Sequence, residues 1–135
     1  MGTVVYLDTS AVLRTVLEAG LSPDMEKRVA AASVLITSRL ALVESARALL
    51  RLRLLGRVSE TDLAAASREI DSIWARCVVW ELSREVCDLA AQLAPQKALR
   101  ALDALHLATF LRARRQLGEV ELVTVDQRLA DAASL

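Results

Sequence analysis

The chain has 135 residues, which suits a single domain over residues 1–135 with a hydrophobic core of its own. Apolar residues make up 54% of the sequence and aromatic residues only 3%, so Leu, Ala and Val must fill that core, and a disordered chain is excluded. The 17 Lys and Arg residues balance the 17 Asp and Glu residues, which excludes polyanion binding through overall charge and leaves only a local basic patch for that purpose.

The sequence also predicts where the protein works. Cys77 and Cys87 form neither a CxxC motif nor a Cys/His metal pattern, which favours two reduced core thiols in the cytoplasm. The start of the chain lacks the basic region and long apolar stretch of a signal peptide. No uncharged run approaches the ~20 residues that span a bilayer. We therefore expect a soluble cytoplasmic protein without a membrane segment.

Strands and helices alternate along the chain. Residues 3–7 form a β-branched and aromatic run, typical of a buried strand, that ends at Asp8. Thr9 or Ser10 is expected to cap the next helix, which Gly20 ends. The other predicted elements are helix 22–32, strand 34–37, helix 41–55, helix 59–74, strand 77–80, helices 83–94 and 102–115, strand 121–125 and helix 127–133.

This alternation predicts the fold class. Strands separated by helices form parallel sheets with helical cover, so we expect an α/β fold with a mostly parallel sheet of four strands. In such sheets, binding sites form beyond the carboxyl ends of the strands. Asp8 follows the first strand and Asp126 follows the fourth, so both should emerge at the same edge.

Asp8 and Asp126 are two of four acidic residues in apolar surroundings, with Glu44 and Asp103 in predicted helices. The four lie too far apart in sequence for local pairing, so only the tertiary fold could assemble them. Converging carboxylates repel one another and need a counter-charge, and oxygen ligands suit Mg²⁺ or Mn²⁺. One or two such ions could activate water for phosphodiester hydrolysis without a histidine base, and the chain has a single histidine.

Each acidic residue alone has a simpler interpretation. Asp8 and Asp126 could cap the helices that follow them. Asp103 could be a first-turn acid favoured by the helix dipole. Glu44 could pair with Arg47, one helical turn further on.

Taken together and in order, four motifs resemble the PIN-domain family, and within it the VapC-type toxins of toxin–antitoxin pairs. They are Asp8-Thr-Ser-Ala, Leu42-Val-Glu-Ser-Ala, Leu102-Asp-Ala-Leu-His-Leu-Ala and Thr124-Val-Asp-Gln-Arg-Leu.

The resemblance implies a three-layer PIN-like fold and a metal-dependent endoribonuclease whose acidic quartet is Asp8, Glu44, Asp103 and Asp126. It also implies a small VapB-like antitoxin that inhibits the enzyme, and a homodimer formed through helical faces. Relatives of this kind typically continue into a fifth strand beyond the last acid, whereas this sequence stops at Leu135, so the sheet has four or five strands.

Further residues are candidates for supporting roles. Ser10 and Thr124 match hydroxyl positions that the resemblance assigns to orienting carboxylates or holding a metal water, although simple capping explains them equally well. Lys97 and Arg100 precede Asp103 and are candidates for contact with RNA phosphates. His106 is interpreted as a hydrogen-bonded histidine at the edge of the core rather than a catalyst.

Two other functions remain as alternatives. A haloacid-dehalogenase-like phosphatase also begins with an aspartate at the end of a strand, but it needs a second Asp two residues later, where this chain has Ser10. A catalytically silent binding module on the PIN fold is the second alternative, because a fold does not guarantee an activity.

Overall fold

The β-branched run at the start of the chain forms the central strand of a four-stranded sheet. The computed structural model describes residues 2–134. The strands are β1 (Thr3–Leu7), β2 (Ala32–Ser38), β3 (Cys77–Trp80) and β4 (Val120–Val123), in the order β3-β2-β1-β4. All three neighbouring pairs are parallel, as the sequence predicted.

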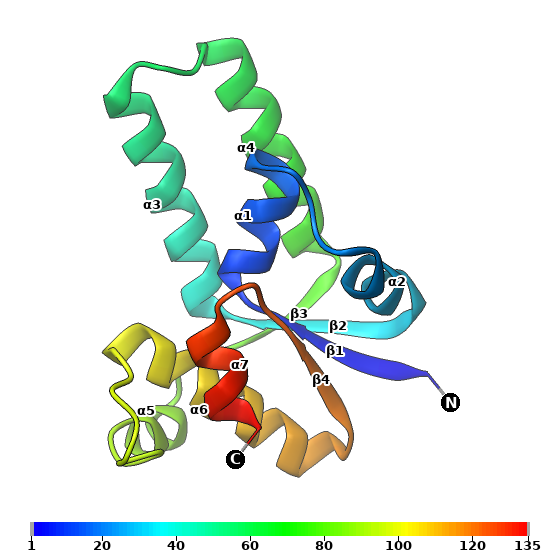
Figure 1. Ribbon diagram of the computed structural model, residues 1–135, viewed down its shortest axis with the longest axis vertical. Coiled ribbons are helices and arrows are strands. Elements are labelled where there is room, and N and C mark those ends of the chain that lie inside the picture. Colours follow the sequence, from blue (N-terminus) through cyan, green and yellow to red (C-terminus); the bar gives the residue numbers. More distant parts are fainter. Residues whose placement is uncertain (1, 135) are drawn as a thin grey trace.

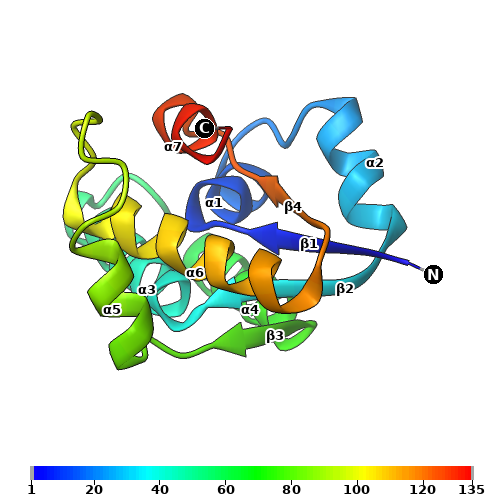
Figure 2. The same cartoon turned by 90° about the horizontal axis from the view of Figure 1, so that it is seen from below.

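Helices cover both faces of this sheet (Figure 1). They are α1 (Thr9–Leu17), α2 (Pro23–Ala31), α3 (Arg39–Leu55), α4 (Glu60–Ala75), α5 (Arg84–Ala90), α6 (Ala101–Leu117) and α7 (Gln127–Ala133). In both views α6 lies on the face of the sheet opposite α1 and α4 (Figures 1 and 2). The predicted α/β fold with helical cover is therefore confirmed. None of these helices, within residues 2–134, combines the length and apolar content needed to cross a membrane.

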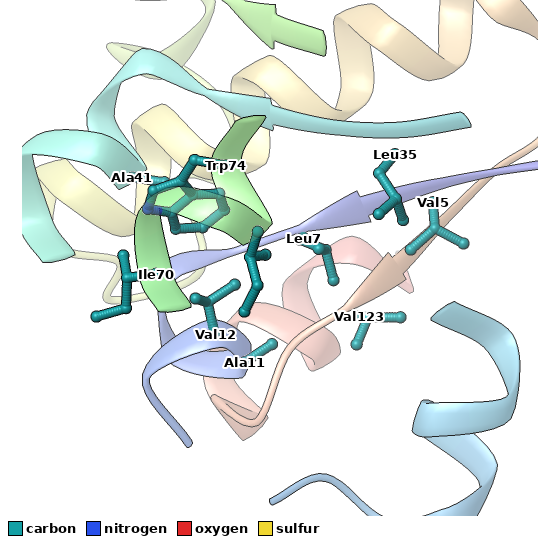
Figure 3. Close-up of a cluster of buried hydrophobic side chains, with 10 residues drawn as sticks. Val5, Leu7, Ala11, Val12, Leu35, Ala41, Ile70, Trp74 and Val123 are labelled. Carbon is teal, nitrogen blue, oxygen red and sulfur yellow. The ribbon is translucent and has the colours of Figure 1, made fainter. Parts of the chain in front are cut away.

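Alternation along β1 divides the core into two clusters, because successive side chains of a strand point to opposite faces. Val5 and Leu7 pack with residues of α1 and α4, including Trp74 (Figure 3). Tyr6 points to the other face and packs with residues of α6 and α7, including Phe110. Both Val5 and Tyr6 are completely buried, so β1 is apolar on both faces, as expected for a central parallel strand.

The start of α1 differs from the prediction. Asp8, and neither Thr9 nor Ser10, is the N-cap, and its Oδ1 accepts a hydrogen bond of 3.0 Å from the backbone N–H of Ala11. Thr9 and Ser10 are instead the first two residues of the helix. The capping prediction was wrong because the carboxylate at the end of the strand reaches the first turn before either hydroxyl does.

Two predicted boundaries were also too long. Helix α5 ends at Ala90 rather than residue 94, and Ala94, just before Pro95, has a positive φ of 46° that breaks any helical continuation. Strand β4 ends at Val123 rather than residue 125. Its partner β1 turns into α1 after Leu7, which pairs with Val123, so Thr124 has no strand to pair with.

Candidate functional site

The carboxyl ends of the strands meet at one edge of the sheet, where new helices begin. Strands β1, β2 and β4 run directly into α1, α3 and α7, and the start of α6 lies near the same edge (Figures 1 and 2). Each of the four predicted acidic residues belongs to one of these helix starts. Asp8 and Asp126 are the N-caps of α1 and α7, Asp103 lies in the first turn of α6, and Glu44 follows the first turn of α3.

Asp8 is a buried carboxylate held by donors of its own chain. Its side chain is bonded by the N–H of Ala11, by Thr124 Oγ1 at 2.7 Å, and by Ser10 Oγ at 2.8 and 2.9 Å from the two carboxylate oxygens. Burial raises the pKa of Asp8, and the hydrogen bonds from Thr124, Ser10 and Ala11 offset that rise only in part. The residue is thus rigidly oriented but poorly solvated as an anion.

The hydroxyls of Ser10 and Thr124 tie Asp8 to the segment that follows β4. Their oxygens lie 3.1 Å apart. Ser10 Oγ accepts the N–H of Val125, and Thr124 Oγ1 accepts the N–H of Asp126. Both side chains therefore orient the Asp8 carboxylate and bring the backbone of Asp126 next to it.

Glu44 takes part in a second network that spans three elements. Its Oε1 accepts hydrogen bonds from Thr9 Oγ1 at 2.5 Å and from His106 Nε2 at 2.6 Å. On the other side of the ring, His106 Nδ1 lies 2.8 Å from the hydroxyl of Tyr6. Burial alone would raise the pKa of Glu44, but the hydrogen bonds from His106 and Thr9 outweigh it and the pKa is lowered. Glu44 is therefore held as a carboxylate.

Asp103 and Asp126 form a pair of like charges. Burial raises the pKa of Asp103, and the negative charge of Asp126 raises it further. Arg100 and His106 counteract this rise, and the Nε of Arg100 lies 4.0 Å from Asp103 Oδ2. One carboxylate oxygen of Asp126 caps α7: Oδ1 accepts a hydrogen bond of 2.9 Å from the N–H of Arg128.

The four acidic residues thus share one edge, but their carboxylates do not converge fully. Within residues 2–134, no three Asp, Glu, His or Cys side chains approach closely enough to hold one ion together. Two of the carboxylates are held by neighbouring side chains: Ser10 and Thr124 engage Asp8, and Thr9 and His106 engage Glu44. Mutual repulsion, which raises the pKa of Asp103, opposes closer approach of the acidic groups.

The chemistry of this donor set nevertheless fits a hard divalent cation. All four groups are oxygen donors, the type of ligand that Mg²⁺ and Mn²⁺ prefer. A cation would relieve both the poor solvation of Asp8 and the repulsion between Asp103 and Asp126. The arrangement therefore supplies negative potential at an edge where phosphate-bearing substrates and their cations can bind.

The sequence analysis overlooked two residues of this edge, Tyr6 and Thr9. Tyr6 lies two residues before Asp8 and therefore points to the same face. This spacing, in a strand that is otherwise aliphatic, could have indicated that Tyr6 belongs to the site. Thr9 gave no comparable signal, because its partners Glu44 and His106 lie 35 and 97 residues away. His106 is buried and hydrogen-bonded, in agreement with its interpretation as a residue of the core edge.

The two predicted phosphate-contact residues lie just before α6. Lys97 is exposed in the turn after α5, where its N–H bonds the carbonyl of Ala94. Arg100 is the residue preceding α6 and is exposed, with its guanidinium near Asp103. Both cationic groups are free to reach solvent on the side where α6 begins.

Comparisons with known proteins agree with this fold. The family model of the PIN domain matches residues 5–135. Ribonuclease VapC46 of Mycobacterium tuberculosis (strain ATCC 25618 / H37Rv) is 33% identical over 129 residues, covering 96% of this chain and 89% of that protein. Ribonuclease VapC35 of Mycobacterium tuberculosis (strain CDC 1551 / Oshkosh) is 34% identical over 134 residues, covering 96% and 90%.

Solved structures share the same architecture. PAE2754 from Pyrobaculum aerophilum superposes with a TM-score of 0.67 at 25% identity, covering 98% of this chain and 87% of that chain. VapC20 of Mycobacterium tuberculosis, described as a sarcin-ricin loop cleaving toxin, has a TM-score of 0.65 at 17% identity, covering 95% and 94%. At that identity the second likeness supports the fold alone. The match over residues 5–135, together with relatives about one-third identical, shows that the chain belongs to the PIN-domain family, in its VapC-type group.

Proposed function

We propose that the chain is a divalent-metal-dependent endoribonuclease that hydrolyses RNA phosphodiester bonds and acts as the toxin of a toxin–antitoxin pair. The observation that carries this proposal is the buried carboxylate of Asp8, oriented by Ser10 and Thr124 at the edge where the other three acidic residues lie. Relatives named ribonucleases support RNA as the substrate class. Membership of the PIN-domain family runs against the haloacid-dehalogenase-like alternative.

Asp8 and Asp103 are the first candidates to hold one or two Mg²⁺ or Mn²⁺ ions, with Glu44 and Asp126 completing the set. When bound, the metal would activate the attacking water and stabilise the leaving oxygen of the phosphodiester. The hydroxyls of Ser10 and Thr124 orient the Asp8 carboxylate. Since burial already excludes water from Asp8, its charge acts through a medium that screens it weakly.

Lys97 and Arg100 are the proposed RNA contacts. Both are exposed basic residues immediately before α6, the helix that carries Asp103. Binding of phosphates by these two cations would place the RNA backbone next to the acidic edge and offset the repulsion between RNA and carboxylates. With zero net charge on the chain, such local contacts are the available source of RNA affinity.

Replacement of Asp8 tests the enzymatic part of the proposal. We expect Asp8→Asn to reduce Mg²⁺- or Mn²⁺-dependent RNA cleavage by more than ~100-fold, since even loss of groups that only support a metal ligand costs 10–100-fold. Circular dichroism should report an unchanged fold. Asp88→Asn, at an exposed aspartate of α5, is the matched control and should cleave like wild type. Metal-dependent cleavage retained by Asp8→Asn would overturn the proposal.

Calorimetry with Mn²⁺ distinguishes the enzyme from a catalytically silent module on the same fold. We expect the wild-type protein to bind Mn²⁺ below millimolar concentration and Asp8→Asn to bind it much more weakly. Loss of RNA cleavage after chelation with EDTA, restored by added Mn²⁺, completes the test. No binding at millimolar Mn²⁺ would favour the silent module.

The antitoxin is proposed to bind in the groove between α3 and α4. This groove is lined mainly by apolar and small side chains, among them Leu42, Ala46, Leu49 and Leu50. Leu50 remains 42% exposed. A small antitoxin that lays an amphipathic helix along this groove would bury that surface. Since α3 also carries Glu44, the bound antitoxin would lie beside the acidic edge.

Leu50→Glu should therefore abolish binding of the product of a neighbouring antitoxin reading frame in co-purification. RNA cleavage by the free toxin should remain. The control is Leu54→Glu, on the same helix but outside the groove lining, where the side chain is 87% exposed. Equal binding by both variants would exclude this groove.

Homodimerisation remains a separate prediction, which light scattering of the purified protein checks.

A further inference from the structure

His106 is the single histidine of the chain, and the proposed hydrolysis assigns it no task. It lies in α6, is only 4% exposed, and is hydrogen-bonded on both sides of its ring. Tyr6 of β1 contacts Nδ1, and Glu44 of α3 contacts Nε2. The ring thus connects the central strand, α3 and α6 at the acidic edge. A histidine that only filled the core would need no bond to a carboxylate.

The direction of these hydrogen bonds follows from the partners. An ionised carboxylate can only accept, so Nε2–H of His106 donates to Glu44 Oε1. In a neutral ring Nδ1 is then the acceptor, and the hydroxyl of Tyr6 donates to it. One tautomer therefore satisfies both contacts: Glu44 requires the proton on Nε2, and the hydroxyl of Tyr6 pairs with the acceptor left at Nδ1.

The consequence for Glu44 is that one oxygen is fixed and the other is left available. Thr9 and His106 both donate to Oε1, and none of the hydrogen bonds within residues 2–134 reaches Oε2. The Glu44 side chain is 24% exposed, so it is not sealed in the core. Locking one oxygen removes the freedom of a long, flexible side chain before any ligand arrives.

We propose that the Tyr6–His106 pair is a positioning device that holds Glu44 ready as a metal ligand. This role rests on the proposed function, because it assumes that Glu44 binds a cation. His106 touches neither substrate nor metal in this role and acts only through Glu44. It resembles the general arrangement in which groups behind a metal ligand orient that ligand and tune its affinity.

Variants at position 106 separate positioning from packing. His106→Gln keeps an amide N–H that can reach the position of Nε2, whereas His106→Leu keeps bulk but has no donor. We expect His106→Leu to weaken Mn²⁺ binding by roughly 10–100-fold and His106→Gln to restore most of that affinity. Tyr6→Phe should give a smaller loss, because it removes the hydrogen-bond partner of Nδ1 but keeps the ring and its bond to Glu44. Leu107→Val, a buried neighbour on α6 that does not contact Glu44, should lower Tm and leave Mn²⁺ affinity unchanged.

A double-mutant cycle supplies the decisive measurement. If His106 acts through Glu44, His106→Leu should cost no further Mn²⁺ affinity in a Glu44→Gln background. In RNA cleavage, His106→Leu should lower kcat at fixed Mn²⁺ with little change in KM for RNA, and excess Mn²⁺ should restore much of kcat.

Three outcomes would overturn the proposal, and they are distinguishable. Unchanged Mn²⁺ affinity in His106→Leu, with a wild type that binds Mn²⁺, overturns the positioning role alone. Additive losses in the double-mutant cycle likewise show that His106 does not act through Glu44. A wild type that fails to bind Mn²⁺ overturns the proposed function and this role with it.

Discussion

Asp8 and Glu44 are neighbouring carboxylates whose surroundings shift their pKa in opposite directions. For Asp8, burial dominates and the pKa rises. For Glu44, the hydrogen bonds from His106 and Thr9 overcome burial and the pKa falls. The first carboxylate is thus destabilised as an anion in the folded protein and the second is stabilised. The two residues should therefore change the dependence of stability on pH in opposite directions.

The pKa of Asp8 is raised in the folded state, so its contribution to stability is complete below its ordinary pKa of 3.8. That contribution is lost as the pH rises through the folded pKa. At pH 7 the ionised carboxylate therefore lowers the stability of the folded protein. We expect Asp8→Asn, measured in EDTA by thermal unfolding at pH 7, to have a Tm at least equal to that of wild type. The difference should shrink as the pH falls through the folded pKa of Asp8 and should be absent below about 3.8. A clearly lower Tm at pH 7 would contradict this reading of Asp8.

The lowered pKa of Glu44 has the opposite consequence. Its stabilising contribution is present above the ordinary value of 4.5 and is lost as the pH falls through the folded pKa. Glu44→Gln should therefore flatten the loss of Tm as the pH falls from 4.5 through the folded pKa, and should be less stable than wild type at pH 7. Glu119→Gln, an exposed glutamate before β4, is the control that keeps the wild-type pH profile. Parallel profiles for all three proteins would argue against a structural role for the Glu44–His106 hydrogen bond.

At the scale of elements, helices α3 and α4 are joined by a buried polar contact. The indole Nε1 of Trp74 donates to Ser45 Oγ at 2.9 Å, and Ser45 donates in turn to the carbonyl of Ala41. Ser45 is 1% exposed. Removing this hydroxyl would leave the indole N–H buried without a partner, which is more costly than losing an exposed hydrogen bond.

Ser45→Ala should lower the free energy of unfolding by about 1–3 kcal/mol, as expected for one unsatisfied buried donor. Urea unfolding followed by tryptophan fluorescence measures it. Ser67→Ala, in the part of α4 that lines the same groove, should change the free energy of unfolding by less than about 0.5 kcal/mol. Equal effects of the two substitutions would show that the Trp74–Ser45 bond contributes little.

Sequence patterns predicted the existence and order of the elements well, because strong local signals mark them. Ser22, Ser59 and Ser83 each cap the helix that follows, as their positions indicate. One error lies where a tertiary partner decides the boundary. Strand β4 stops because β1 turns away, and no pattern near residue 124 records that event.

The candidate site was predictable only in part for the same reason. Asp8 and Asp126 share an edge because parallel strands end together, which sequence and topology imply. The contact of Glu44 with Thr9 and His106 depends on how α3 and α6 cross the sheet edge, and the residues involved are far apart in sequence. The incomplete convergence of the carboxylates within residues 2–134 was also beyond reach of sequence reasoning.

At the scale of the whole molecule, the two cysteines report on different parts of the fold. Burial raises the pKa of the Cys77 thiol to about 11, whereas Cys87 is exposed on α5, so the prediction of two core thiols was wrong for Cys87. At pH 8 the Cys77 thiol is almost entirely protonated and unreactive, since only the thiolate is nucleophilic. We expect iodoacetamide to modify Cys87 first, with Cys77 modified only as β3 opens at the sheet edge. Mass spectrometry of timed samples checks this, and equal rates at the two sites would contradict it.

The position of β1 also has a consequence for how the protein is made. Strand β1 leaves the ribosome first, yet one of its two neighbours, β4, is synthesised more than 100 residues later. Thr124, which bonds Asp8, arrives equally late. The α3–α4 pair joins residues close in sequence and can form early, while the sheet must wait for its long-range partner. A nascent chain therefore carries Asp8 without Thr124 or Asp126 through most of its synthesis, and the acidic edge is assembled only once residue 126 has emerged.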